Sequence, residues 1–209
     1  ENKYPFLVIL DPGHGGEDTG TIKHAWGQVL IEKNFSLELA IKTAKILQNQ
    51  GIAVALTRTQ DKSLSLDERA QIANQWASYA EQAVFVSVHA NSSHNPESSG
   101  IETYVLNAAT NDASKRLADI ENGGHKHIAK TTKTAPRPKR ATVDLILSDL
   151  NTTANYSESM RLACVLHRNI LKGLKQSFMP ARDRGIKHAM FYVLMKLQMP
   201  GVLFEPGFA

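Results

Sequence analysis

The chain has 209 residues, of which 42% are hydrophobic and 21% charged. This composition is typical of a single globular domain and excludes a disordered chain. Its formal net charge of +4 suits an acidic polymer as ligand, but the basic stretch lacks the interleaved aromatic residues of a nucleic-acid binder. No apolar run reaches the length of a membrane span, and one cysteine, Cys164, excludes an internal disulfide.

Strand-like and helix-like stretches alternate along the chain. Short apolar or alternating runs that stop at a turn predict strands at residues 6–10, 52–58, 83–90, 100–106 and 201–205. Apolar residues at helical spacing predict helices at residues 32–50, 65–80, 111–121, 156–176 and 185–194. This alternation predicts an α/β fold, with a mostly parallel twisted sheet flanked by helices on both faces in one domain, 1–209.

Residues that can bind metal or move protons follow three of these strands. His14 lies in the turn DPGHGG after the first strand, and His89 and Glu205 end two others. Ligands bind at the carboxyl ends of parallel strands, so we expect these side chains to converge. With Glu32, which opens the first helix, they match the inventory of a catalytic zinc site: three protein ligands and a carboxylate as general base.

Each of these residues also has a simpler structural interpretation. Glu32 alone would suit the positive end of a helix dipole, and Glu205 alone would suit a helix cap or an ion pair. The glycines around His14 would serve a tight turn, or a phosphate cradle, although DPGHGG lacks the lysine of GxxxxGK[ST] and does not fit GxGxxG. The spacing alone therefore leaves a metal site and a structural turn as alternatives.

Seven segments, taken together and in this order, resemble the zinc-dependent N-acetylmuramoyl-L-alanine amidases of bacterial cell walls. They are LDPGHGGEDTG (10–20), EKN (32–34), GIAVALTRTQD (51–61), LSLDERAQIAN (64–74), VFVSVHANSS (84–93), GIETYVL (100–106) and MPGVLFEPGF (199–208). The resemblance implies one zinc ion per chain, held by His14, Glu32 and His89, with Glu205 as the catalytic carboxylate. It implies hydrolysis of the amide between N-acetylmuramic acid and L-alanine of peptidoglycan stem peptides, for septal wall splitting in the periplasm.

Residues 107–141 fit the core pattern least well and form the expected regulatory insert. In division-associated amidases of Gram-negative bacteria a helix in this region covers the zinc site, and LADIEN (117–122) resembles it. The resemblance implies that Glu121 occupies the water position and inhibits the enzyme; the alternative is a solvated residue at a helix end. An inhibited amidase needs an activator, by resemblance a LytM-domain protein. His125 and His127 are predicted to lie in a solvated loop rather than in a second metal site.

Four further polar residues lie in the resembling segments. Asp11 is expected to orient His14 from behind, with a turn-forming role as the alternative. Asn91 is expected in the wall of the pocket, because an amide is a weak zinc ligand. Arg58 and Arg69 are each expected to pair with a carboxylate close to them in the sequence.

The sequence thus predicts a monomeric zinc hydrolase that acts on peptidoglycan and has no nucleic-acid partner. Two other functions remain as alternatives. One is hydrolysis of another amide, such as that of a free muropeptide or an acetylated sugar. The other is a catalytically silent peptidoglycan-binding module of the same fold, which would tolerate the loss of Glu205.

Overall fold

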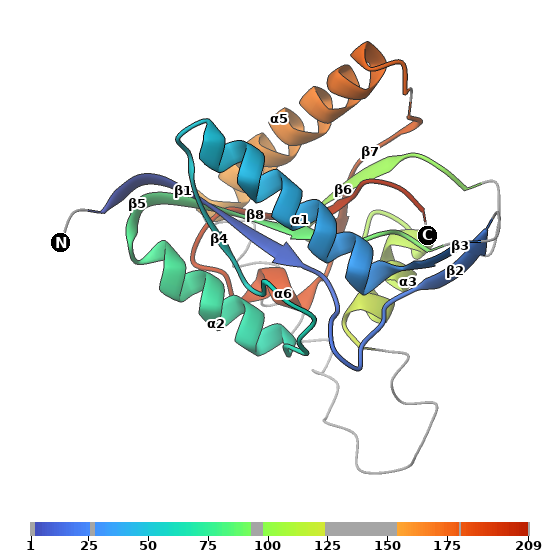
Figure 1. The fold of residues 1–209 in the computed structure, drawn as a ribbon, viewed down its shortest axis with the longest axis horizontal. Helices are drawn as coiled ribbons and strands as arrows, with labels where there is room; N and C mark the ends of the chain where they lie inside the picture. The colour runs from blue at the N-terminus through green and yellow to red at the C-terminus, as the bar shows by residue number, and fades with distance from the viewer. Residues whose placement is uncertain (1–2, 26–27, 93–97, 124–153, 180, 209) are drawn as a thin grey trace, which may run out of the picture.

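The computed structural model describes residues 3–25, 28–92, 98–123, 154–179 and 181–208 (Figure 1). At its centre is a six-stranded sheet in the order β4-β1-β5-β8-β6-β7. The strands are β1 (Tyr4–Pro12), β4 (Ala53–Leu56), β5 (Ala80–Val88), β6 (Ile101–Leu106), β7 (Asp183–Ala189) and β8 (Gly201–Glu205). β6 runs antiparallel to β8, and every other neighbouring pair in this sheet is parallel.

Helices cover both faces of the sheet (Figure 1). One layer consists of α1 (Glu32–Asn49) and α5 (Ala154–Gln176), and the other of α2 (Leu66–Ala77), α3 (Asp112–Glu121) and α6 (Tyr192–Met195). Successive strand residues point to opposite faces, so each face has its own apolar cluster. On β1, Leu7 packs on the α2 side and Leu10 on the α1 side. The predicted α/β fold, mostly parallel with helices on both faces, is confirmed.

Local sequence signals explain where several helices begin and end. The Ser65 side chain accepts a hydrogen bond from the Glu68 backbone, and the Glu68 side chain accepts one in return, which completes the predicted capping box before α2. Asn111 caps α3 by accepting from the backbone of Ser114 at 2.9 Å. Gly51, with a φ of 79°, lies just beyond the end of α1.

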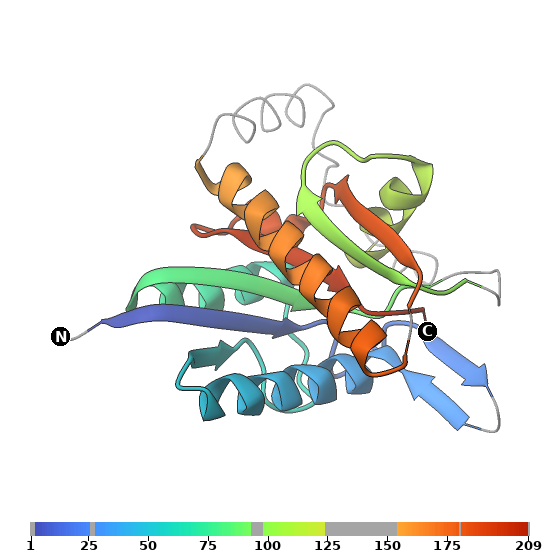
Figure 2. The same cartoon turned by 90° about the horizontal axis from the view of Figure 1, so that it is seen from above.

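Two parts of the fold differ from the sequence prediction. β2 (Ile22–Ala25) and β3 (Gln28–Ile31) form an unpredicted hairpin, which Figure 2 shows projecting at the end of the sheet to which β1 and β5 point. The prediction of a helix over 185–194 is wrong, because residues 183–189 form β7 and only Tyr192–Met195 are helical. Parallel pairing with β6, which brings Lys187 opposite Tyr104, overrides the helical spacing of the apolar residues.

The expected insert is described only in its first half. Residues 107–123 contain α3, as predicted, whereas residues 124–141, with His125 and His127, lie outside the described residues. Within the described part of the chain, no helix is both long and apolar enough to cross a membrane.

Candidate metal centre

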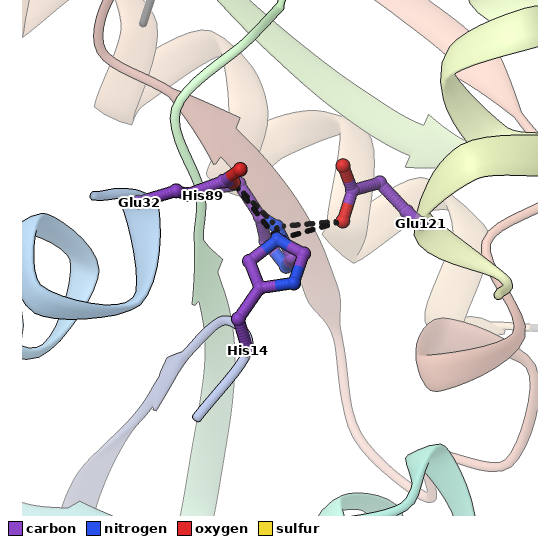
Figure 3. A group of neighbouring side chains, drawn as sticks. All are labelled: His14, Glu32, His89 and Glu121. Carbon is purple, nitrogen blue, oxygen red and sulfur yellow. Dashed lines mark hydrogen bonds and ion pairs between the residues drawn. The ribbon is translucent and has the colours of Figure 1, made fainter. Parts of the chain in front are cut away.

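Four side chains meet beside the carboxyl ends of β1 and β5 (Figure 3). His14 follows β1 and His89 follows β5, whereas Glu32 is the first residue of α1 and Glu121 the last residue of α3. One nitrogen or oxygen atom from each side chain lies within 4.8 Å of the corresponding atoms of the other three. The structure thus brings together three of the predicted site residues and the predicted inhibitory residue.

The distances within this cluster suit a single metal ion. Glu32 Oε1 lies 3.0 Å from His14 Nε2 and 3.2 Å from His89 Nδ1. Glu121 Oε2 lies 3.3 Å and 2.8 Å from the same two nitrogens and approaches them from the side opposite to Glu32 (Figure 3). Ligand atoms of a tetrahedral zinc are separated by roughly 3.3 Å, and imidazole and carboxylate are both zinc ligands. The residues present therefore fit a zinc ion.

The turn after β1 holds His14 in a rare backbone conformation. His14 has a φ of 57°, in the left-handed region that non-glycine residues seldom occupy. Two buried arginines fix the carbonyl groups of this turn. Arg69 donates to Pro12 O and His14 O, both at 2.6 Å, and Arg58 donates to Gly13 O at 2.7 Å. The arginines thus stabilise the conformation that presents the imidazole.

The hydrogen bonds of Asp11 differ from those expected. Its buried carboxylate accepts from the hydroxyl groups of Thr57 and Ser87 and from the guanidinium of Arg69. Asp11 therefore supports His14 through Arg69 and the backbone, not through the imidazole, and Arg69 does not pair with a carboxylate close in sequence. The side chain that faces His14 Nδ1 is Asp18, at 3.2 Å, a position from which a carboxylate can orient a metal-binding histidine. Its four-residue spacing from His14 was the only signal in the sequence.

Glu32 is a buried anion that the backbone holds in place. Its Oε1 accepts a hydrogen bond from Ala90 N at 2.9 Å, and its Oε2 accepts one from Thr21 N at 2.8 Å. Burial alone would raise the pKa of this carboxyl, but the hydrogen bonds from His14 and His89 lower it. Glu32 therefore presents a fixed negative charge to the two imidazoles.

The carboxylates also change the proton affinity of both histidines. Burial alone would lower the pKa of His14, but contacts with Asp18, Glu121 and Glu32 raise it to about 12. Burial opposes the two glutamates in the same way at His89, and its pKa rises to about 10. A divalent cation would be attracted by the same negative surroundings and would replace these protons, because a ligating imidazole nitrogen must be unprotonated.

Glu205, which was also expected to converge on this site, is not among the four clustered side chains. It lies fully buried at the end of β8, close enough to His89, Glu121 and Glu32 for their charges to act on its carboxyl group. Within the described part of the chain, no group donates a hydrogen bond to either of its carboxylate oxygens. Burial raises its pKa well above the usual range; His89 opposes this rise, and the negative charges of Glu121 and Glu32 add to it. A carboxyl group with raised proton affinity is suited to general acid–base chemistry near neutral pH.

The four clustered residues line a cavity of about 430 Å³. α3 forms part of its wall through Ile120, Glu121 and Asn122. Asn91 was expected in this wall but is not among the lining residues. Its side-chain amide instead donates to the buried carboxylate of Glu102 at 2.8 Å.

Gly20 lies so close to His14 and Glu32 that a larger residue at this position would displace their side chains. An added Cβ would lie 2.6 Å from both Glu32 Oε2 and His14 Cδ2. We expect Gly20→Ala to weaken zinc binding by roughly 10- to 100-fold, measured by titration against a chelator of known affinity.

Gly51→Ala is the matched control for this substitution. Gly20 and Gly51 have φ values of 61° and 79°, so alanine costs about 1–2 kcal/mol of backbone strain at either position. Apart from its two chain neighbours, no atom of the described residues lies within 4 Å of a Cβ added at Gly51. Zinc affinity equal in the two variants would contradict the assigned metal site.

The chain matches the family model described as N-acetylmuramoyl-L-alanine amidase over residues 8–209. Among individual relatives, it is 33% identical over 204 residues to a protein named N-acetylmuramoyl-L-alanine amidase AmiA from Salmonella typhimurium. This match covers 97% of the chain and 65% of the relative, so the chain spans less than two thirds of that protein's length.

Solved structures of similar proteins share the fold. The chain aligns with an N-acetylmuramoyl-L-alanine amidase from Clostridium difficile 630 at 31% identity and a TM-score of 0.61, covering 100% of this chain and 81% of the other. The amidase AmiC2 of Nostoc punctiforme gives 26% identity and the same TM-score, with 99% and 81% covered.

Proposed function

Because the chain belongs to the N-acetylmuramoyl-L-alanine amidase family, we propose that it is a zinc hydrolase of peptidoglycan. The bond cleaved is the amide between N-acetylmuramic acid and L-alanine of the stem peptide. The observation that carries this proposal is the convergence of His14, Glu32 and His89 in one cavity. The cavity lies at the end of the sheet where β8 finishes in the buried Glu205.

His14, Glu32 and His89 would hold one zinc ion per chain. The ion would supply Lewis acidity toward the amide carbonyl and would lower the pKa of water toward about 7. Glu205 accepts the proton of the attacking water, for which its raised pKa suits it, and delivers that proton to the leaving nitrogen. Glu32 keeps its position through both steps, because two backbone amides hold its carboxylate.

Glu121 inhibits the resting enzyme in this proposal. Its carboxylate lies 2.8 Å from His89 Nδ1 and 3.3 Å from His14 Nε2, so it would occupy the place that the attacking water needs. Two sets of hydrogen bonds support the placement of α3. Asn122 donates to Met190 O at 2.7 Å and accepts from Tyr192 N at 2.8 Å at one end, and Thr110 pairs with His188 at the other.

Activity then depends on a partner that displaces α3. The resemblance of residues 117–122 to the helix of division-associated amidases supports a LytM-domain protein as this partner. It likewise supports a role in septal wall splitting and a location in the periplasm. The mild positive charge of the chain suits a polymer whose stem peptides carry carboxylates.

Metal content and product analysis together test the proposal. We expect about one zinc per purified chain and none in His89→Ala. A chain carrying Glu121→Ala should release peptides with a free amino-terminal L-alanine from purified peptidoglycan, identified by mass spectrometry. If this variant binds zinc and peptidoglycan but releases no peptide, the chain is a silent binding module and the hydrolase proposal is wrong.

A further inference from the structure

Glu102 and Glu205 lie side by side on adjacent strands. They are directly opposite each other in the antiparallel pairing of β6 and β8. Residues opposite each other in such a pair point to the same face of the sheet. Two pairs further along, and therefore on the same face, Tyr104 and Leu203 belong to the apolar cluster under α2, α3 and α6. Both glutamates therefore point to the face that α3 covers, and both are at most 2% exposed.

The two carboxylates differ in the number of hydrogen-bond donors around them. Glu205 has no hydrogen-bond donor among the described residues, whereas Glu102 has four. The donors to Glu102 are the Asn91 amide, the Tyr104 hydroxyl, the Arg184 guanidinium and the Lys187 ammonium group. Burial alone would raise the pKa of Glu102, but the hydrogen bonds from Lys187, Tyr104 and Arg184 lower it. Glu102 is thus a buried anion that hydrogen bonds from four side chains hold in place.

Through Asn91, Glu102 is joined to the segment that carries His89. Asn91 lies two residues after His89, and its side chain donates to Glu102 Oε2 at 2.8 Å. The backbone of Asn91 donates to Gly207 O at 2.9 Å and forms a parallel bridge with Phe208. This contact links the end of β5 to the segment after Glu205.

Arg184 provides a second link between Glu102 and the segment after Glu205. The guanidinium of Arg184 donates to Glu102 Oε1 and lies 4.8 Å from the centre of the Phe208 ring, a cation–π contact. Lys187 donates to Glu102 Oε1 at 2.7 Å and adds a second cation from β7. The segment after β5, two residues of β7 and the segment after β8 are therefore linked through one carboxylate at the start of β6.

We propose that Glu102 is a positioning residue that fixes the distance between His89 and Glu205. It does not touch the reacting atoms, because its four donors occupy both of its oxygens. Its effect is geometric: a general base must stay within hydrogen-bond reach of the water it activates, and displacement by about 1 Å costs about 100-fold in rate. This inference rests on the proposed function for the roles of His89 and Glu205.

Glu102→Gln tests the inference, because glutamine keeps the shape but brings an NH₂ group against existing donors. In a Glu121→Ala background, we expect kcat to fall roughly 10- to 100-fold while KM changes less than about twofold and zinc stays at about one per chain. Thr103→Val is the matched control: Thr103 is equally buried on the same strand but bonds to His167 on the opposite face. The control should leave kcat and KM unchanged.

Hydrogen exchange provides a readout that needs no activity. The Asn91 amide and the 206–208 peptide should exchange about tenfold faster in Glu102→Gln than in the parent, and no faster in Thr103→Val. Unchanged kcat and exchange in Glu102→Gln would overturn the inference, and so would equal losses in both variants. If even the parent releases no peptide, the proposed function fails, and the exchange rates still decide whether Glu102 positions these strand ends.

Discussion

Glu205→Gln is expected to reduce amide hydrolysis by about 10²- to 10⁴-fold without loss of zinc. Glutamine matches the shape of glutamate but cannot accept the proton of the attacking water. Glu205 has no hydrogen-bond donor among the described residues, so the substitution breaks no hydrogen bond with them. The measurement is the rate of stem-peptide release in a Glu121→Ala background, with zinc determined on the same samples.

Glu81→Gln is the matched control, because it makes the same chemical change at an exposed position near the start of β5. It should leave both rate and zinc content unchanged. Activity close to that of the parent in Glu205→Gln would mean that another group accepts the proton. Loss of zinc in that variant would instead make Glu205 part of the metal site.

Glu121→Ala is expected to raise basal hydrolysis by roughly 10- to 100-fold, the range of a coupling energy of about 1–3 kcal/mol. The substitution removes the carboxylate that lies 2.8 Å from His89 Nδ1 and frees the ligand position for water. The residues proposed to hold zinc remain, so its content should stay at about one per chain. Peptide release by the purified protein without any partner measures the effect.

Asp119→Ala provides the comparison on the same helix. Asp119 is exposed and also carries a carboxylate, so its loss changes the charge of α3 equally without changing the cluster. Basal activity should not rise in this variant. A fall in activity or zinc content in Glu121→Ala would show that Glu121 serves as a permanent ligand, contrary to the inhibitory role.

Features set by local sequence were predictable. The apolar runs before His14, His89 and Glu205 marked three central strands, and the capping box at Ser65 marked the start of α2. The rule that ligands gather at the carboxyl ends of strands then predicted that His14 and His89 lie together. Glu121 could be proposed only from resemblance, because nothing in the local sequence indicates which way the end of α3 points.

Features set by long-range pairing were not predictable. Asp11 binds Arg69, 58 positions away, and Glu102 binds Arg184 and Lys187, more than 80 positions away. Sequence spacing carries no information on such contacts, so the only roles predicted for Asp11 were orienting His14 and forming a turn. Glu102 did leave one signal: a charged residue stands within the strand GIETYVL, where burial requires partners for it.

Under the proposed inhibition by α3, the packing of this helix sets a free-energy cost for activation. Leu117 and Ala118 belong to the apolar cluster that also contains Phe191 and Val193, so moving the helix away exposes core surface to water. Exposing Leu117 alone costs about 2 kcal/mol, which limits the uncovered form to roughly one chain in thirty at rest. A protein that recognises only that form loses the same factor in apparent affinity. By mass action, the proposed activator would then need a roughly thirtyfold higher concentration to half-activate the enzyme, which would stay silent wherever that protein is dilute.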